Sequence, residues 1–212
     1  MRSFPYHLRT EGRALGSRVA TFRTILIHVA LVVVFGVFLP WSKGLEFLDP
    51  VITAAYACLG ILFAAPAAAQ SFVGERPRAM AEAMARILMA VLYGECVAAA
   101  MLLTGFATVY LTHLHRTMFA PELQTLAAAG ALGLTGSLAL AAGAAYISLR
   151  FSADVAKAAL RMIFVLILFA FLYRSQRLPD VAATGAWMCL VVASAEMLAL
   201  WLALRHGDTT RG

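Results

Sequence analysis

Charged residues are scarce in this sequence. Only 13% of the 212 residues are Asp, Glu, Lys or Arg, whereas 62% are hydrophobic, and the mean hydropathy is +0.84. A soluble domain is about half apolar and about a quarter charged. The shortage of charge therefore excludes an ordinary soluble domain and predicts a membrane protein.

Residue patterns for catalysis or cofactor binding are also poorly represented. The only lysines, Lys43 and Lys157, do not lie in a glycine-rich phosphate loop, so no ATP-binding site of that kind is expected. Ser137 has no histidine in a later span to activate it, which argues against an intramembrane serine protease. His113 and His115 are two residues apart and do not share a helical face for a metal or haem. We therefore expect a protein that is not an enzyme and has no cofactor or metal site.

The cysteines and the basic charge suggest neither disulfides nor nucleic acid. Cys58, Cys96 and Cys189 each lie within an apolar run and show no paired spacing, so we expect small buried side chains. The net charge of +6 comes mostly from arginines at the ends of apolar runs, where they can meet anionic lipid headgroups. No cleavable signal peptide is evident, because the first apolar run is too long and no small-residue cleavage motif follows it.

Long apolar runs dominate what is present. A spanning helix needs about 20 apolar residues. Six runs meet or approach that length, at about 20–39, 51–73, 87–112, 123–149, 157–173 and 181–204. No linker between them is long enough for a soluble domain. The sequence predicts an all-α polytopic membrane protein in which residues 1–212 form a single six-helix domain.

The positive residues predict the orientation. With the N-terminus in the cytoplasm, thirteen of the 17 Lys and Arg residues fall on the inner side and four on the outer side. Because positive charge is enriched in cytoplasmic loops, both termini are expected on the cytoplasmic side of a bacterial inner membrane. Residues 1–19 form a basic cytoplasmic segment, which is either an interfacial helix or a disordered tail.

A charged stretch separates the second apolar run from the third. Pro77 stands where a helix would start. Arg78, Glu82 and Arg86 then recur every fourth residue, with Met80 and Met84 on the opposite side. This spacing predicts an amphipathic helix over residues 74–86 that lies on the cytoplasmic membrane surface, with Glu82 paired to both arginines. The alternative is an ordinary charged loop that anchors two spans.

Small residues form two stripes at helical spacing. The fourth run carries Ala129, Gly133, Ser137, Ala141 and Ala145, and the second carries Gly60, Ala64 and Ala68 beside Pro66. Small residues let helices approach closely in lipid, so both stripes predict tight helix packing.

A few polar residues fall inside the apolar runs. His28, Glu95 and Glu196 are each about eight residues from the cytoplasmic end of a span, which is ~12 Å deep. Gln70 lies slightly nearer the same surface. Buried charges need a partner or a water-filled cavity, so a shared polar layer is expected. Such a layer either lines the inner mouth of a transport path or fixes the bundle by hydrogen bonds.

Two segments resemble ABC-2 type transporter permeases. Residues 67–76 run from a small-residue helix into Gly74-Glu75-Arg76, and residues 143–156 resemble that family's fourth span and its cytoplasmic turn. The basic N-terminal segment is similar to the family's interfacial helix, and the short length is similar to its haem-exporter B members. The linker at residues 174–180 is too short for the re-entrant helices that many such permeases have between their last two spans.

The resemblance implies a permease subunit driven by a separate ATP-binding cassette subunit. Contact with that ATPase is expected at Glu75, Arg76, Arg78, Glu82 and Arg86. The permease would work as a homodimer or beside a sister permease, surrounded by lipid. Two alternatives are a small-molecule-binding subunit similar to the S-component of a vitamin importer, and a structural subunit of a larger membrane complex.

Overall fold

The computed structural model describes residues 4–19, 21–73, 77–113, 123–151 and 177–209, together with residues 155, 158, 159 and 162. Within these residues the regular structure is entirely helical. The elements are α1 (Phe4–Val19), α2 (Phe22–Leu31), the π-helix η1 (Val32–Phe38), α3 (Leu39–Lys43), the 3-10 helix η2 (Gly44–Leu48), α4 (Pro50–Ala57), α5 (Gly60–Val73), α6 (Met80–His113), α7 (Leu123–Arg150) and α9 (Leu178–Thr209).

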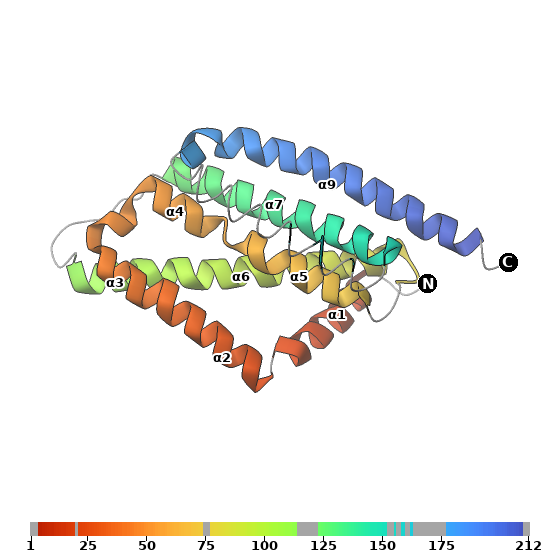
Figure 1. The fold of residues 1–212 in the computed structure, drawn as a ribbon, viewed down its shortest axis with the longest axis horizontal. Coiled ribbons are helices and arrows are strands. Elements are labelled where there is room, and N and C mark those ends of the chain that lie inside the picture. Colours follow the sequence, from red (N-terminus) through yellow and green to blue (C-terminus); the bar gives the residue numbers. More distant parts are fainter. Residues whose placement is uncertain are drawn as a thin grey trace.

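Five helical stretches are long and apolar enough to cross a membrane. They are Thr24–Leu48, Pro50–Phe72, Met80–Thr112, Gln124–Arg150 and Asp180–Arg205. These confirm five of the predicted runs, while the run at 157–173 lies largely outside the described residues. Figure 1 shows α1 and the ends of α5, α7 and α9 toward one end of the molecule, with α3 and the starts of α7 and α9 toward the other. The predicted inner segments in the described part therefore gather at one end.

The first span is one helical rod with a change of winding in its middle. The π-helix η1 joins α2 to α3, and Gly44, with φ of 56°, turns the chain into η2. A π-helix pairs main-chain groups five residues apart and not four, and side-chain hydroxyls from other helices also bond to carbonyl oxygens of η1. Tyr56 donates a hydrogen bond of 2.7 Å to the Phe35 oxygen, and Thr108 donates one of 3.0 Å to the Gly36 oxygen.

The second span is broken into α4 and α5. Asp49 caps α4 by accepting a hydrogen bond of 2.7 Å from the Val51 amide, and Pro50 takes the first helical position. The helix stops at Ala57, where Cys58 Sγ donates to the Ala129 oxygen of α7 at 3.4 Å. α5 restarts at Gly60 and carries Pro66 in its interior. At this break the Ala57 oxygen lies against Gly133 of α7 and the Gly60 oxygen against Gly94 of α6.

Both predicted small-residue stripes are buried packing faces. Ala129, Ser137, Ala141 and Ala145 of α7 and Ala64 and Ala68 of α5 are completely buried, and Gly60 and Gly133 are buried with them. α7 packs against α5 on one side and α9 on the other. Where α5 and α6 cross, a Cβ added to Gly94 of α6 would lie 2.5 Å from the Gly60 oxygen. This confirms that small residues bring the helices together.

The structure decides or corrects three local predictions, which concern the N-terminal segment, the amphipathic helix and the cysteines. Residues 4–19 form helix α1, packed against α6, so the N-terminal segment is a helix rather than a disordered tail. Helix α6 begins at Met80 and continues to His113, so residues 80–86 are its first turns and not a separate surface helix. Pro77 precedes the helix. The prediction of buried cysteines is confirmed for Cys58 and wrong for Cys96, which is exposed, while Cys189 is only half-buried.

Candidate functional site

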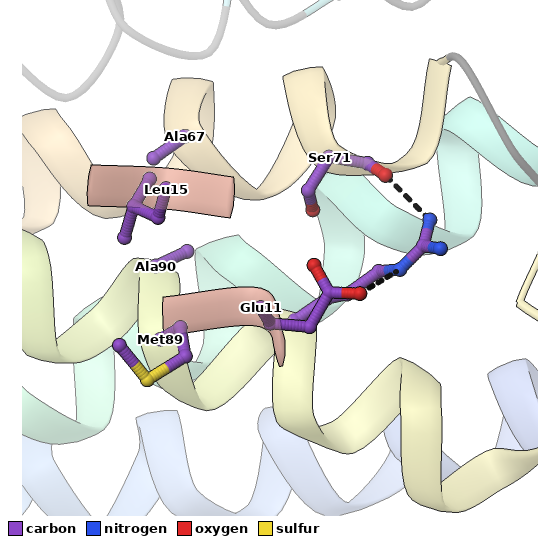
Figure 2. A pocket seen from close by; sticks show the side chains of 7 residues that line it. Glu11, Leu15, Ala67, Ser71, Met89 and Ala90 are labelled. Carbon is purple, nitrogen blue, oxygen red and sulfur yellow. Dashed lines mark hydrogen bonds and ion pairs between the residues drawn. The ribbon is translucent and has the colours of Figure 1, made fainter. Parts of the chain in front are cut away.

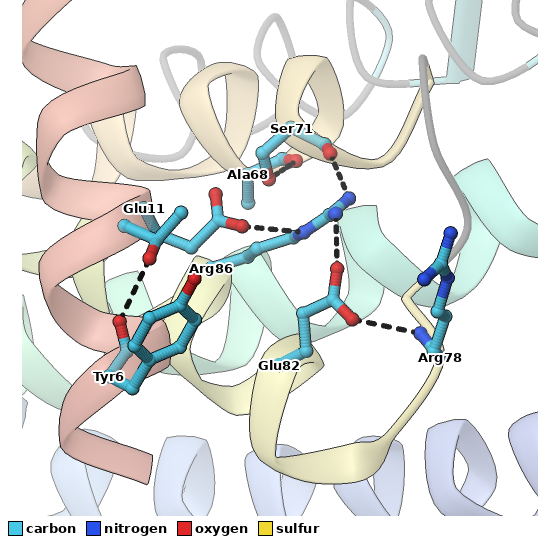
Figure 3. A network of polar contacts seen from close by, with 8 residues as sticks. Tyr6, Glu11, Ala68, Ser71, Arg78, Glu82 and Arg86 are labelled. Atoms are coloured by element: carbon cyan, nitrogen blue, oxygen red, sulfur yellow. Dashed lines mark hydrogen bonds and ion pairs between the residues drawn. The ribbon is translucent and has the colours of Figure 1, made fainter. Parts of the chain in front are cut away.

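A buried arginine joins three helices where α5 ends and α6 begins. Arg86 projects from the second turn of α6, and only 4% of its side chain is exposed. Its Nε donates to Glu11 of α1 at 3.2 Å, its Nη1 to the Ser71 oxygen of α5 at 2.6 Å, and its Nη2 to Glu82 at 2.6 Å (Figure 3). The guanidinium also stands 5.6 Å from the ring centre of Phe72. We call Glu11, Ser71, Glu82 and Arg86 the Arg86 cluster.

Each partner in the Arg86 cluster follows from helix-end chemistry. The Ser71 oxygen lies in the last turn of α5, where carbonyls lack an intrahelical donor and a positive charge is favourable. Glu82 lies in the first turn of α6, where a carboxylate is favourable, and its Oε2 accepts from the Arg78 main-chain amide at 2.9 Å. One arginine therefore caps one span while pairing with the carboxylate that caps the next.

The Arg86 cluster is closed rather than open to a ligand. A cavity of about 10 Å³ lies beside it, lined by Glu11, Leu15, Ala67, Ser71, Arg86, Met89 and Ala90 (Figure 2). That volume has room for about one water molecule. Two carboxylates, each with a side chain 16% exposed, already face the guanidinium. The cluster is thus suited to holding helices together and not to binding an anion.

The fold separates the residues that were predicted to contact an ATPase subunit. Glu75 and Arg76 lie outside the described residues. Arg78 is exposed, whereas Arg86 is buried, so the expectation of a shared wet face is wrong for Arg86. The predicted pairing of Glu82 with Arg86 is confirmed, but Glu82 meets Arg78 through the main chain. The sequence pattern missed Glu11 and Ser71; a lone acidic residue among the N-terminal arginines is the available signal for Glu11.

The four predicted intramembrane polar residues have separate surroundings. No hydrogen bond or ion pair joins any two of His28, Gln70, Glu95 and Glu196, all of which the structure describes. His28 Nδ1 bonds the Thr24 oxygen at 2.6 Å, and its Nε2 pairs with the Tyr93 hydroxyl. Gln70 is exposed on α5. Within one chain, the shared layer is therefore not formed by direct contacts, and a layer across two copies stays a prediction.

Glu95 and Glu196 contact different residues of α7. Ser137 donates a hydrogen bond of 2.6 Å to Glu95 Oε1, and the same carboxylate rests on Gly60 of α5. The Glu196 carboxylate lies over Gly143, where an added Cβ would be 2.7 Å from Oε1. Among the described residues, Glu196 Oε2 and Ser148 Oγ are buried without a hydrogen-bond partner. Ser137 was assigned only to a packing face of its helix, and the sequence pattern did not single out Tyr93 as a partner of His28.

Metal-ligating side chains do not cluster in the part of the chain that is described. No group of three or more His, Cys, Asp or Glu side chains comes together there as a metal site. The helices and their composition define a multi-span helical membrane protein. Comparison with protein-family models, curated proteins and solved structures gives no match for this chain.

Proposed function

We propose that this chain is the transmembrane permease subunit of an ABC-type transporter, which moves a substrate across the bacterial cytoplasmic membrane while a separate ATPase subunit supplies the energy. Several spans, a basic helix before the first and a charged corner after the second support the resemblance to ABC-2 type permeases. The observation that carries the proposal is the Arg86 cluster.

The Arg86 cluster would make one end of the bundle mechanically continuous. Arg86 ties α1 and the end of α5 to the start of α6 through bonds to Glu11 and the Ser71 oxygen. A displacement of α1, or of the corner at residues 77–79, would pass into two spans and not be absorbed by a loose loop. This is what a permease driven by a separate ATPase requires.

The surface open to such a partner is formed by other arginines. Arg9 and Arg13 are exposed one turn apart on α1, and Arg78 is exposed at the corner. Arg86 would act behind this surface by transmitting the displacement. The first and last described spans bury only 11% of their most apolar windows, which leaves apolar faces for lipid and for a second copy or a sister permease.

Co-purification with an ATPase tests the proposal. The tagged full chain is purified from membranes of the cells that encode it, and its partners are identified by mass spectrometry. We expect to recover an ATPase with a P-loop. The double variant Arg9→Glu, Arg78→Glu should retain at least about tenfold less of this ATPase, because its new glutamates would face the acidic residues of the ATPase that we expect to pair with Arg9 and Arg78. Such like-charge contacts cost several kcal/mol. Arg205→Glu is the matched control, since Arg205 is exposed near the C-terminal end of α9. That end of α9 lies toward the same end of the molecule as α1 (Figure 1). Recovery of the folded chain with no P-loop ATPase above background would overturn the proposal.

A further inference from the structure

A second and larger cavity lies between the start of the first span and helices α5 and α6. Its volume is about 220 Å³, and its lining residues are Leu15, Thr24, Leu62, Phe63, Pro66, Ala67, Gln70 and Tyr93. It adjoins the small cavity beside Arg86, because Leu15 and Ala67 line both. We call it the α2–α5 cavity.

The walls of the α2–α5 cavity are mixed in polarity but carry no formal charge. Leucine, phenylalanine, proline and alanine side chains form most of the lining, and the polar side chains are those of Thr24, Gln70 and Tyr93. An ionised ligand in such a place would leave its charge unpaired at a large cost. The cavity therefore favours an uncharged molecule that carries both polar and apolar groups.

Pro66 changes the main-chain hydrogen bonding of α5 beside the cavity. A proline has no N–H, so the Leu62 oxygen, four residues earlier in α5, lacks its normal helical donor. Leu62 and Pro66 both line the cavity. In a membrane span such an oxygen needs a donor from another helix, a water molecule or a ligand.

Tyr93 supplies a second acceptor, and its position is fixed. The Thr24 oxygen can only accept, so His28 Nδ1 carries the hydrogen in their 2.6 Å bond. In the neutral ring, Nε2 then accepts from the Tyr93 hydroxyl. The lone pairs of the Tyr93 oxygen remain available to a ligand, while His28 holds the phenol ring in place from α2.

The volume sets the size of the occupant. A cavity of ~150 Å³ is known to hold benzene, so about 220 Å³ corresponds to roughly nine non-hydrogen atoms. We propose that the α2–α5 cavity binds a small uncharged amphipathic molecule whose hydroxyl or amide head donates to the cavity oxygens and whose apolar body lies against Leu62 and Phe63. This inference does not rest on the proposed transport function.

Photolabelling with a diazirine analogue of octanol tests the inference, because 1-octanol has the required size, head and apolar body. The full chain in lipid nanodiscs is labelled and the modified peptides are mapped by mass spectrometry. We expect label on the α5 and α6 segments that contain Pro66 and Tyr93, displaced by excess 1-octanol and not by octane. Ala67→Phe should reduce this label at least about fivefold by filling the cavity. Ala131→Phe, at an exposed position on α7, should not reduce it.

A gentler variant keeps the test decisive if Ala67→Phe does not fold. Tyr93→Phe retains the ring and removes the acceptor oxygen, so the apparent octanol affinity should fall about fivefold, as expected for one lost hydrogen bond. Label spread evenly over lipid-facing helices, or displaced equally by octane, would overturn the inference.

Discussion

Arg86 of α6 donates a hydrogen bond of 2.6 Å to the main-chain oxygen of Ser71 in the last turn of α5. The same guanidinium pairs with Glu11 and Glu82. Arg86 is therefore buried between helices, although it belongs to a series of charged residues that recur at every fourth position. A buried ion pair contributes little against apolar replacement, but removing one partner leaves charges and a carbonyl without compensation. The first prediction follows from this asymmetry.

Replacing Arg86 by Ala should destabilise the folded chain by about 3–5 kcal/mol, because Glu11, Glu82 and the Ser71 oxygen lose their donor. Arg86→Lys should fall in between, since an ammonium retains the charge but not the three-way fork. The measurement is chemical or thermal unfolding of the purified protein in detergent. Arg78→Ala is the control and should change stability by less than about 0.5 kcal/mol, because its side chain is exposed. Equal stability of the Arg86→Ala protein and the wild type would contradict a stabilising role for the Arg86 cluster.

Two glycines provide a matched test of helix packing. A Cβ on Gly94 would lie 2.5 Å from the Gly60 oxygen and 2.9 Å from the Ala64 nitrogen, whereas a Cβ on Gly130 meets nothing within 4 Å. Gly94→Ala should therefore force α5 and α6 apart and cost about 1–3 kcal/mol. Gly130→Ala should be neutral or stabilise α7 by up to ~1 kcal/mol. If both substitutions shift the unfolding midpoint alike, the close crossing of α5 and α6 is refuted.

The hydrogen bond between Ser137 and Glu95 allows structure and function to be separated. Ser137→Ala leaves Glu95 without its donor and should cost about 1–3 kcal/mol, whereas Ser194→Ala loses only a bond to its own helix and should be nearly silent. Glu95→Gln keeps an acceptor for Ser137 and should leave the unfolding midpoint nearly unchanged. If Glu95 serves transport, that variant should still lose transport activity. A Glu95→Gln protein that unfolds as readily as Ser137→Ala would show that the hydrogen bond is not preserved.

Much of the fold was predictable from the sequence because the bilayer imposes simple requirements. Span length and hydropathy located five spans, and the small-residue stripes located the buried faces of α5 and α7. Both signals are local along one helix. The polar contacts were less predictable, because their partners are distant in sequence. The helical repeat of Arg78, Glu82 and Arg86 placed Arg86 on a wet face, since nothing in residues 78–86 reveals that Glu11 approaches.

The orientation can be checked with single cysteines in a background lacking Cys58, Cys96 and Cys189. Ser42 and Ala79 are exposed, near opposite ends of their spans. With the predicted cytoplasmic termini, Ser42→Cys should react with a membrane-impermeant maleimide added to intact cells, and Ala79→Cys should react only after the cells are opened. The opposite labelling pattern would reverse the orientation and remove the corner at residues 77–79 from the cytoplasm.

Site-specific crosslinking at that corner tests the transporter account most directly. A photoreactive amino acid placed at Ala79 in the full chain, in its native membrane, should crosslink to a P-loop ATPase, and the same amino acid at Ser42 should not. Identification of the adduct by mass spectrometry decides the outcome. Crosslinks from Ala79 to lipid alone, or equally to the same proteins from both positions, would contradict coupling to an ATPase through this corner.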